Sequence, residues 1–402
     1  MLNQRREKKV IFRLRTYQKE AADAAVACFK RGMWNGLLIM PTGSGKAIVI
    51  ADVASRLDAP LLVFQPSREI LLQNYDKIMR TGMTDVGIYS ASLGMKNIRR
   101  ITLATIGSVH NHMDDFRLFR YVIVDEAHRV SADDGMYKDY LTSREDRCII
   151  GLTATPYRMS SAMGYAKLSF LTRTKPRIYD RVLYVCQVSD MMDNGYLCRP
   201  RYFDVTDKIA FRLSNVKLNA SGLDYDDVSL ESEYRRSNFA MDLLRWTLMV
   251  LHPNDGSQRN GVLVFTRFIR EAEVLRNGLL RYGISAVTVT SKTPKDERRR
   301  AVEGFRNGAI RVCTNAGAML EGYDHPSLDT VIIASPTRSL TRYAQMVGRV
   351  LRPFGNKEPW VLDLSGNYRY YGKMEDIRIE NVSGVNQWIV TSNGRELTGI
   401  IN

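Results

Sequence analysis

The stretch Gly36-Leu-Leu-Ile-Met40, followed by Pro41-Thr-Gly-Ser-Gly-Lys-Ala47, decides the fold of this chain. A short apolar run leads into a glycine-rich loop, and a helical pattern begins at Ile48. Glycines let successive backbone N–H groups turn inward around a triphosphate, the helix N-terminus adds partial positive charge, and the lysine reaches the outer phosphates. We therefore predict a phosphate-binding loop whose nucleotide-binding residues are Pro41, Thr42, Gly43, Ser44, Gly45, Lys46 and Ala47.

The last residue of this loop departs from the usual pattern. A hydroxyl that binds Mg²⁺ normally follows the lysine, whereas this chain has Ala47 there. Met40 also stands where the strict pattern has a small residue, and a Gly-Ser-Gly run can belong to a linker. Other features of the sequence are needed to decide between a loop and a linker.

The composition is that of a basic protein with two domains. A chain of 402 residues with 45% apolar residues can bury two cores, each in a domain of about 150–200 residues. The net charge of +15 favours a polyanionic partner, although a basic surface can also serve solubility alone.

Cysteine spacing and hydropathy exclude several other classes of protein. The five cysteines are scattered and include no Cys-x-x-Cys pair, which argues against a zinc module or a disulfide framework. No stretch approaches the roughly 20 apolar residues that span a bilayer, and the start lacks the apolar core of a signal peptide. We expect a cytoplasmic protein without a membrane partner.

Short apolar runs alternate with amphipathic helical patterns in two successive series. This alternation predicts an α/β fold with parallel sheets flanked by helices. The predicted strands cover residues 36–40, 61–64, 101–104, 121–124 and 148–152, and then residues 262–265, 286–290, 310–314, 330–334 and 360–364. Because ligands of such sheets bind at the carboxyl ends of the strands, the chemistry should lie on the loops that follow them.

The two series predict two domains, at residues 1–200 and 201–402. We interpret residues 201–257 as a connecting region, because they contain an acidic irregular piece and a turn-rich piece. Residues 380–402 are predicted to form a terminal hairpin around an Asn-Gly turn.

An acidic pair follows the predicted strand at 121–124. In Asp125-Glu-Ala-His128, Asp125 can hold Mg²⁺ and Glu126 can polarise the water that attacks a γ-phosphate. A surface acidic pair near a helix start is the alternative for such a pair standing alone. Its position after an apolar strand, in the same domain as the phosphate loop, favours the catalytic interpretation.

Two further motifs contribute polar groups. The strand at 148–152 leads into Thr153-Ala-Thr155, whose hydroxyls can bond the acidic motif, although an ordinary strand-to-turn transition explains this pattern as well. In residues 345–353, Arg349 and Arg352 are predicted to share one helix face. Arginines so placed can stabilise charge on a γ-phosphate, which increases the rate of hydrolysis about 10³–10⁵-fold in other nucleotide hydrolases. The alternative is that the two arginines lie on a solvated basic helix face.

Together these motifs, in this order, resemble those of superfamily 2 nucleic-acid helicases of the DEAD/DEAH-box type. The resemblance covers almost the whole chain: residues 14–18 resemble the adenine-recognising start of the fold, 41–47 motif I, 125–128 motif II, 153–155 motif III, 264–267 motif IV, 316–326 motif V and 345–352 motif VI. It implies an α/β protein of two tandem RecA-like lobes with an ATP cleft between them.

The resemblance also implies the residues of the site. With ATP and Mg²⁺ as cofactors, the implied catalytic residues are Lys46, Asp125, Glu126, Gln345, Arg349 and Arg352, with Asp125 as the metal ligand. The further nucleotide-binding residues are Arg15, Gln18, Gly322 and Asp324, and Gln18 is the reader of the adenine. Because Ala47 offers no hydroxyl and Mg²⁺ keeps several waters when bound, we expect active hydrolysis with a high demand for the metal.

Within the superfamily the chain is most similar to RadD-like DNA-repair helicases and to related phage and restriction-system motors. The residues responsible are 14–21, 151–158, 194–197, 348–353 and 362–367. We therefore expect the protein to reside in the cytosol of a bacterium or of a phage-infected host.

Single-stranded or branched DNA is the expected partner, held through its backbone by hydroxyls and basic groups that do not read sequence. The candidate contacts are Ser67, Arg68, Thr105 and Ser108 in the first domain, and the resemblance points to Thr266, Arg267 and Thr314 in the second. A basic run, Arg298-Arg-Arg300, is better interpreted as a solvated helix face.

The favoured hypothesis is an ATP-dependent DNA helicase or translocase that acts in repair, recombination or replication. An RNA helicase is the first alternative, although motif VI begins with Gln345 where DEAD-box enzymes have a His-Arg pair. The second alternative is an ATP-switched binding or annealing factor, or the motor subunit of a defence complex with a partner protein.

Overall fold

The computed structural model describes residues 13–131, 134–162, 165–253, 256–259, 261–317, 325, 327–384 and 386–401. The chain divides into two compact units. The first runs to Arg158 and includes Ser169–Gln187 and Asn381–Trp388, and the second comprises Met159–Leu168, Val188–Glu380 and the residues from Ile389 onward. The domain division predicted at residue 200 lies close to the boundary after Gln187.

An eight-stranded sheet forms the centre of the first unit. Its strand order is β10-β1-β7-β6-β2-β5-β3-β4, and every pair except β3–β4 is parallel. The strands are β1 (Gly36–Ile39), β2 (Leu61–Phe64), β3 (Val86–Ser90), β4 (Met95–Lys96), β5 (Ile101–Ala104), β6 (Tyr121–Asp125), β7 (Cys148–Thr153) and β10 (Arg181–Val185). All five strands predicted for this half of the chain are confirmed, and β3, β4 and β10 are additional.

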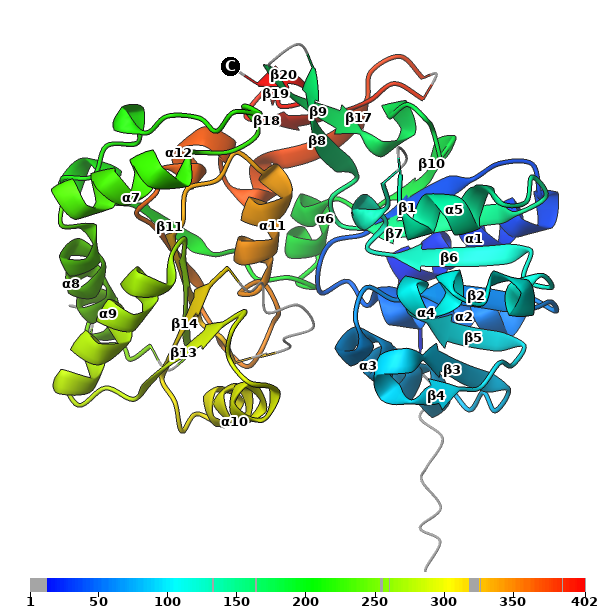
Figure 1. The fold of residues 1–402 in the computed structure, drawn as a ribbon, viewed down its shortest axis with the longest axis horizontal. Helices are drawn as coiled ribbons and strands as arrows, with labels where there is room; N and C mark the ends of the chain where they lie inside the picture. Colours follow the sequence, from blue (N-terminus) through cyan, green and yellow to red (C-terminus); the bar gives the residue numbers. More distant parts are fainter. Residues whose placement is uncertain are drawn as a thin grey trace, which may run out of the picture. The chain divides into compact units, whose positions relative to one another are not determined.

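The strand order determines on which face of the sheet each helix of this unit lies. The helices are α1 (Thr16–Arg31), α2 (Lys46–Arg56), α3 (Arg68–Arg80), α4 (Ile106–His110) and α5 (Met136–Thr142). The chain moves one way along the sheet through α2 and α3 and returns through α4 and α5, so right-handed crossovers put the two pairs on opposite faces. Figure 1 shows α4 and α5 on the near face of this sheet. The sheet is therefore doubly wound.

A parallel six-stranded sheet forms the centre of the second unit, with the strand order β11-β16-β15-β12-β14-β13. The strands are β11 (Arg201–Asp204), β12 (Val262–Thr266), β13 (Ala286–Thr290), β14 (Val312–Ala316), β15 (Thr330–Ala334) and β16 (Trp360–Asp363). The helices are α6 (Val188–Asp193), α7 (Asp227–Arg236), α8 (Phe239–Leu251), α9 (Ile269–Arg281), α10 (Lys295–Arg306), α11 (Leu340–Gly348) and α12 (Asn367–Tyr371). All five strands predicted for this half are confirmed within two residues.

The interpretation of residues 201–257 as a connecting region is wrong. These residues supply the edge strand β11 and the helices α7 and α8, and their apolar side chains belong to the core of the second unit. Tyr234 of α7 and Phe239 of α8 stack with their ring centroids 4.1 Å apart. The polar pieces that suggested a connection are only the loops between these elements.

The C-terminal segment contains the predicted hairpin. β17 (Ile377–Asn381), β18 (Trp388–Ser392) and β19 (Arg395–Glu396) form a small sheet in which β18 and β19 are antiparallel. Asn393 and Gly394 both have positive φ, 49° and 76°, as the tight hairpin turn requires. A further three-stranded sheet contains β8 (Tyr157–Ala162), β9 (Tyr165–Phe170) and β20 (Gly399–Ile401).

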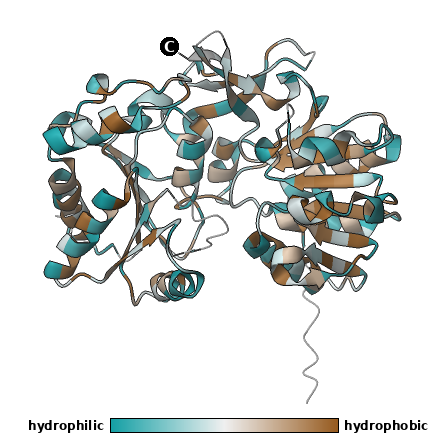
Figure 2. Ribbon diagram, in the orientation of Figure 1, coloured by the Kyte–Doolittle hydropathy of each residue, from teal (hydrophilic) through white to brown (hydrophobic). Residues whose placement is uncertain are grey.

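Burial of the strands explains why they were visible in the sequence. β2, β5, β12 and β15 are buried at every residue, as continuous apolar runs of parallel sheets are expected to be. Figure 2 shows the hydrophobic colour concentrated in the strands and the hydrophilic colour on outer helix faces. Among the described residues, no helix is long and apolar enough to cross a bilayer.

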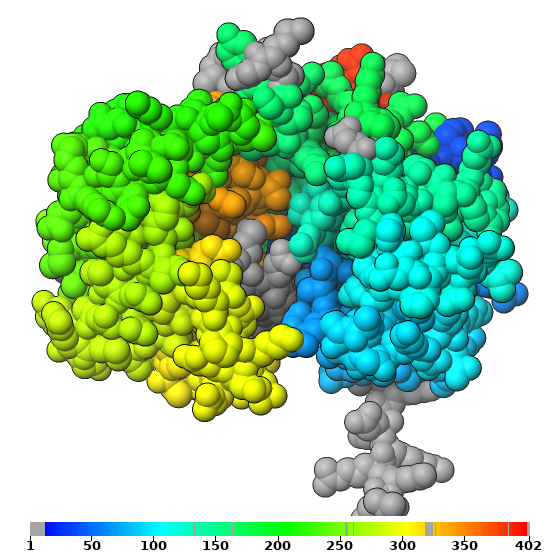
Figure 3. Space-filling view, in the orientation of Figure 1, coloured from blue at the N-terminus to red at the C-terminus, as the bar shows by residue number. Residues whose placement is uncertain are grey.

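The surface of α10 matches its prediction. Arg299 is exposed and pairs with Asp296 of the same helix, while Arg298 donates to the carbonyl of Thr290 at 2.8 Å. Figure 3 shows α10, in yellow, on the open surface of its unit. The run Arg298-Arg-Arg300 thus lies on a largely solvated helix face.

Candidate functional site

The phosphate loop connects β1 directly to α2. The N–H of Met40 bonds the carbonyl of Thr153 at 2.9 Å, which continues the pairing of β1 with β7 up to the start of the loop. Gly43 and Gly45 have φ of 88° and 82°, a region in which side chains other than glycine are strained. α2 then begins at Lys46, so its free N–H groups face the same loop.

Two side chains of α1 hold the phosphate loop through hydrogen bonds. The Tyr17 hydroxyl and the Gln18 amide both donate to the carbonyl of Ser44, at 2.9 and 2.8 Å. The Gln18 Oε1 accepts from the N–H of Arg15 at 3.0 Å. A Cβ added at Gly45 would lie 2.6 Å from Gln18 Nε2, so a larger residue there would have to displace the Gln18 amide as well as adopt a strained φ of 82°. Gln18 therefore holds the loop, and its reading of adenine stays a prediction.

The loop lysine pairs with the acidic motif. Lys46 Nζ lies 2.7 Å from Glu126 Oε1, and both side chains are largely buried. Glu126 has a positive φ of 54°, which is strained for a residue with a Cβ and is typical of functional sites. Asp125 ends β6 and accepts the N–H of Glu126 at 3.0 Å. Sequence reasoning correctly brought Lys46, Asp125 and Glu126 together.

Asp125 is an unusual carboxyl group because it is 5% exposed. Burial raises its pKa to about 6, an effect that nearby Lys46 opposes. Its second oxygen accepts a hydrogen bond from Asn74 Nδ2 of α3 at 3.3 Å. The same Asn74 nitrogen donates to Gln65 Oε1, at the end of β2, at 2.8 Å. Neither Gln65 nor Asn74 was recognised from the sequence, where the only signal was a polar residue on the apolar face of a helix.

His128 connects the acidic motif to the two threonines after β7. Its Nδ1 lies 3.0 Å from Thr153 Oγ1, 3.1 Å from Thr155 Oγ1 and 3.4 Å from Glu126 Oε2. Burial lowers the pKa of His128 to about 4, so the ring is neutral near pH 7 and can share one proton with these oxygens. The predicted bonding between the threonines and the acidic motif is confirmed, with His128 as the intermediary.

The residues around the loop fit a nucleotide that carries its own metal. Ser44 Oγ is buried and has no hydrogen-bond partner among the described residues, and Lys46 supplies positive charge. Ala47 is 5% exposed and offers no oxygen, whereas Asp125, at the end of β6, has carboxylate oxygens that could hold a metal. The described part of the chain has no group of three or more His, Cys, Asp or Glu side chains placed to hold a metal. A Mg²⁺ ion here would depend on phosphate oxygens and water.

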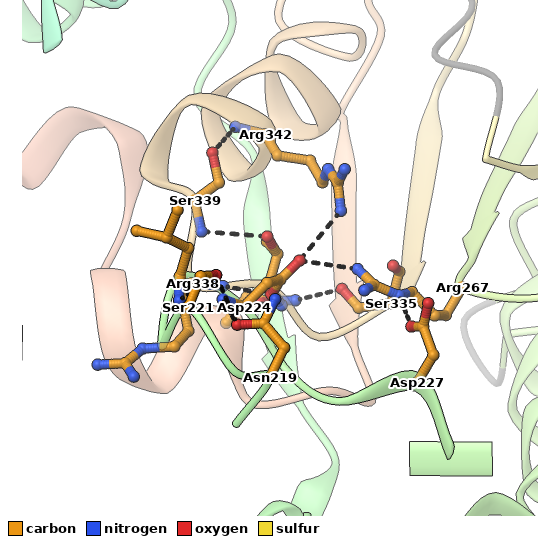
Figure 4. A network of polar contacts seen from close by, with 12 residues as sticks. Asn219, Ser221, Asp224, Asp227, Arg267, Ser335, Arg338, Ser339 and Arg342 are labelled. Carbon is orange, nitrogen blue, oxygen red and sulfur yellow. Dashed lines mark hydrogen bonds and ion pairs between the residues drawn. The ribbon is translucent and has the colours of Figure 1, made fainter. Parts of the chain in front are cut away.

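The second unit has a separate polar cluster at the ends of β12 and β15. Asp224 Oδ2 accepts Arg267 Nη1 at 2.8 Å and lies 3.5 Å from Arg342 Nη1, as Figure 4 shows. Asp224 Oδ1 accepts the N–H of Arg338 at 3.2 Å. Arg267 also binds Asp227 at 2.8 Å. We call Asp224, Asp227, Arg267, Arg338 and Arg342 the arginine cluster.

The loop that carries Asp224 is tightly organised. Asn219 and Asp224 bond each other through backbone and side chain, and Arg338 Nη1 donates to the carbonyl of Gly222 at 3.2 Å. These bonds hold an acidic loop against the motif IV arginine, and Figure 4 shows Asn219, Asp224 and Arg267 in this arrangement. Arg267, predicted to contact nucleic acid, is therefore engaged by two carboxylates of its own unit, and its contact with nucleic acid stays a prediction.

Motif VI differs from its prediction in local structure. α11 ends at Gly348, Arg349 is its C-terminal cap, and Arg352 lies beyond the helix, so the two arginines do not share a helix face. Arg352 precedes Pro353, and a residue before proline avoids helical backbone angles. Gln345 and Arg349 are half-buried, and burial lowers the pKa of Arg352.

Predicted nucleic-acid contacts in the first unit fall into two classes. Ser67 caps the N-terminus of α3 by accepting the N–H of Ile70 at 3.3 Å, and Arg68 pairs with Glu69 at the surface. Thr105 caps α4 and is half-buried. Ser108, by contrast, is buried, and its hydroxyl bonds the N–H of Ala91 at 2.8 Å. Its assignment as a surface contact is not supported.

In the second unit the prediction for Thr314 is wrong. Thr314 lies inside β14 with no exposed surface, and its hydroxyl contacts Thr288 Oγ1 at 2.8 Å and the carbonyl of Ala272 at 3.3 Å. A strand residue that faces a helix cannot also face a ligand at the strand end. Thr266, at the end of β12, is 4% exposed and donates to the carbonyl of Phe268. The predicted nucleotide-binding residues Gly322 and Asp324 lie outside the described residues.

Two protein families match this chain in the order expected from its motifs. The family described as "Type III restriction enzyme, res subunit" matches residues 11–158, and the "Helicase conserved C-terminal domain" matches residues 242–353. The first match contains the phosphate loop and the acidic motif, and the second contains motifs IV to VI.

Individual relatives agree with these matches. A "51.5 kDa protein" of a Lactococcus phage is 24% identical over 83% of this chain and 66% of its own length. The "DNA 3'-5' translocase XPB2" of Sulfurisphaera tokodaii is 25% identical over 84% of this chain and 78% of its own. A solved structure, "ATP-dependent Type ISP restriction-modification enzyme LlaBIII bound to DNA", shares the fold with a TM-score of 0.64 and 17% identity, over 89% of this chain and 28% of that one.

The chain spans 50%, 66% and 53% of the lengths of three of its curated relatives, about half to two thirds. Within that span, both parallel sheets, the ordered motifs and the two matched families agree. The chain belongs to the superfamily 2 helicases and has restriction-type relatives.

Proposed function

We propose that this protein is an ATP-dependent DNA helicase or translocase. The observation that carries the proposal is the joint geometry of Lys46, Glu126 and the buried Asp125 beside a glycine-rich loop. Such a constellation is what hydrolysis of a nucleoside triphosphate requires. Relatives named as DNA translocases and a basic chain with a net charge of +15 favour DNA as the partner.

In this proposal the loop and the start of α2 bind the nucleotide. The N–H groups of residues 43–47 and the Lys46 ammonium hold the phosphates, and Gln18 and Tyr17 keep the loop in shape through the Ser44 carbonyl. Asp125 holds Mg²⁺, whose bound form neutralises charge on the phosphates. A phosphate bound at the loop would compete with Glu126 for the three N–H donors of Lys46 and would weaken their 2.7 Å ion pair.

Glu126 then becomes available as the residue that orients water and accepts its proton. Its neighbour His128, neutral near pH 7, keeps the Glu126 side chain near Thr153 and Thr155. Gln345, Arg349 and Arg352 are the residues of the second unit proposed to act on the nucleotide. Candidate DNA contacts that the described geometry leaves open are Ser67, Arg68, Thr105 and Arg267, whereas Thr266 is as buried as Ser108.

The proposal is tested by measuring phosphate release from ATP with single-stranded, forked and duplex DNA and with RNA, over a range of Mg²⁺ concentrations. We expect Mg²⁺-dependent hydrolysis stimulated most by DNA with a single-stranded part, and strand displacement on the forked substrate. The Glu126→Gln variant should still bind ATP but should not release phosphate. Stimulation by RNA alone would instead establish an RNA helicase.

A second candidate function rests on Ala47, which leaves the metal with few protein ligands. A protein that binds ATP but turns it over negligibly would use it as a switch for binding or annealing nucleic acid. Absence of phosphate release at every Mg²⁺ concentration, with ATP-dependent DNA binding retained, would favour this switch. A native mass measurement with cell extract would show whether a partner protein, as in a defence complex, joins the chain.

A further inference from the structure

Asn74 is a polar residue on the buried face of α3. The other buried residues of this helix are Leu71 and Ile78, which lie three residues before and four residues after it. A helix that only needed to pack would carry a third apolar residue at this position. Burying an amide is unfavourable unless its hydrogen-bonding groups find partners, so Asn74 requires a specific explanation.

The partners of Asn74 supply this explanation. Its Nδ2 donates to Asp125 Oδ2 at 3.3 Å and to Gln65 Oε1 at 2.8 Å, and all three side chains are less than 7% exposed. An ionised carboxylate only accepts, so Asp125 fixes which end of the Asn74 amide faces it, and Asn74 in turn orients Gln65. Gln65 Nε2 is left buried with no partner in the described chain, a destabilising arrangement for a purely structural network.

α3 connects this network to the candidate nucleic-acid contacts. Ser67 caps the helix and Arg68 is its first residue, while Asn74 lies about 10 Å further along the same rigid rod. A backbone phosphate bound at Ser67 and Arg68 would draw on the N-terminus of this helix, where free N–H groups favour an anion. Any shift of α3 along its axis would move Asn74 relative to Asp125.

We propose that Asn74 is a positioning residue that holds Asp125 for the metal and transmits to it the position of α3. The inference rests on the proposed function, because it concerns how DNA at α3 stimulates ATP hydrolysis. The Asn74–Asp125 separation of 3.3 Å exceeds the usual N–H···O distance of about 2.9–3.0 Å, whereas the Asn74–Gln65 bond does not. A movement of a few tenths of an ångström would therefore strengthen the bond to Asp125.

The test compares Asn74→Leu, which keeps the branching at Cγ, is larger and loses the donor, with Asn74→Asp, which keeps the shape and adds a repelling charge. The control is Asp76→Asn, the reverse exchange on the exposed face of the same helix. For Asn74→Leu we expect kcat with single-stranded DNA to fall about tenfold or more, as for other residues that orient a metal ligand, with KM for ATP within twofold. The ratio of DNA-stimulated to basal hydrolysis should fall toward one, and Asn74→Asp should be more severe.

A readout without turnover separates positioning from packing. Binding of Mn²⁺ to the ADP-bound protein, followed by electron paramagnetic resonance, should weaken about tenfold in Asn74→Leu and stay unchanged in Asp76→Asn. Thermal unfolding identifies any variant that is misfolded. If Asn74→Leu is misfolded, the Mn²⁺ affinity is measured on Asn74→Asp instead. Unchanged Mn²⁺ affinity and an unchanged stimulation ratio in folded variants would overturn the inference. A wild-type protein without DNA-stimulated hydrolysis would instead overturn the proposed function, while the Mn²⁺ comparison would still decide whether Asn74 positions Asp125.

Discussion

The two units each contain a charged cluster, and the two clusters differ in their balance of charge. In the first unit one lysine faces two carboxyl groups, Asp125 and Glu126, and burial raises the pKa of Asp125 to about 6. In the second unit the carboxylates Asp224 and Asp227 pair with the guanidinium groups of Arg267 and Arg342, and Asp224 also accepts the backbone N–H of Arg338. A site with surplus carboxylate is suited to a cation, whereas a cluster in which carboxylates and arginines balance is suited to holding segments of the chain together.

The difference extends to what each cluster does in the folded chain. Lys46 and Glu126 have other roles in the proposed reaction, so their 2.7 Å pair is expected to weaken when a nucleotide binds. Asp224 joins three separate segments, the 219–227 loop, the end of β12 and the start of α11. The first cluster should therefore matter for rate, and the second for stability.

The largest expected effect is that of Lys46→Ala. Removing the loop cation should lower kcat for ATP hydrolysis by about 10²–10³-fold, because the lysine stabilises charge that develops on the phosphates. Phosphate release measures the rate, and Lys30→Ala, an exposed lysine of the same unit, is the control. If Lys46→Ala hydrolyses ATP within threefold of the wild-type rate, this cluster does not determine the rate.

Asp224→Ala should act mainly on stability. It leaves Arg267 and Arg342 without a carboxylate they share, and we expect the free energy of unfolding of the second unit to fall by about 1–3 kcal/mol. Urea denaturation measures this change. Asp296→Ala removes an exposed pair and should change stability by less than about 0.5 kcal/mol. Equal effects of the two substitutions would show that the arginine cluster is no more than a surface network.

Ala47→Ser tests how strongly the cluster of the first unit binds its cation. The hydroxyl restores a metal ligand next to Lys46. Because a protein oxygen then replaces a water that Mg²⁺ gives up, the Mg²⁺ concentration for half-maximal hydrolysis should fall several-fold. Ala51→Ser, a buried alanine one turn later in α2, is the matched control and should leave the Mg²⁺ dependence unchanged. An identical Mg²⁺ requirement in Ala47→Ser and wild type would mean that water replaces the hydroxyl fully.

Arg342→Gln should have the smallest effect on stability. Its bond to Asp224 is long at 3.5 Å and its side chain is 42% exposed, so unfolding should change by less than about 0.5 kcal/mol. Arg342 also lines a cavity of about 210 Å³ with Thr266 and Asn315. If it contacts a DNA phosphate there, the slope of log affinity against log salt should decrease by about one. A salt slope equal to that of wild type would assign Arg342 to the structural part of the cluster.

Much of the fold could be predicted because its strands are buried on both faces. Residues 61–64, 101–104 and 330–334 form strands with the predicted bounds, since continuous apolar runs between polar loops have few other uses in a chain of this kind. The edge strand at 286–290 also has its predicted bounds, although only part of it is buried. The missed strand β3, Val86-Gly-Ile-Tyr-Ser90, contains a glycine and a serine that weaken this pattern. β11, Arg201-Tyr-Phe-Asp204, was missed because only two apolar residues lie between its arginine and its aspartate.

The site divides in the same way. Lys46, Asp125 and Glu126 could be assigned because each follows a strand, and the carboxyl ends of parallel strands meet at one edge of a sheet. Asn74 and Asp224 could not, because their importance lies in partners 51 and 43 residues away in the sequence. Thr314 was misassigned because a motif does not say on which side of its strand a hydroxyl points.

The sequence by itself determined the two parallel sheets, the phosphate loop with its missing hydroxyl at Ala47, and the family to which the chain belongs. These depend on local order: apolar runs, glycines and charged residues at fixed spacing. Only the tertiary structure decided that Asn74 bonds Asp125, that an acidic loop binds Arg267, and that α11 ends before Arg349. Those outcomes depend on which side chains the folded backbone brings within about 3 Å, and a one-dimensional pattern does not contain that distance.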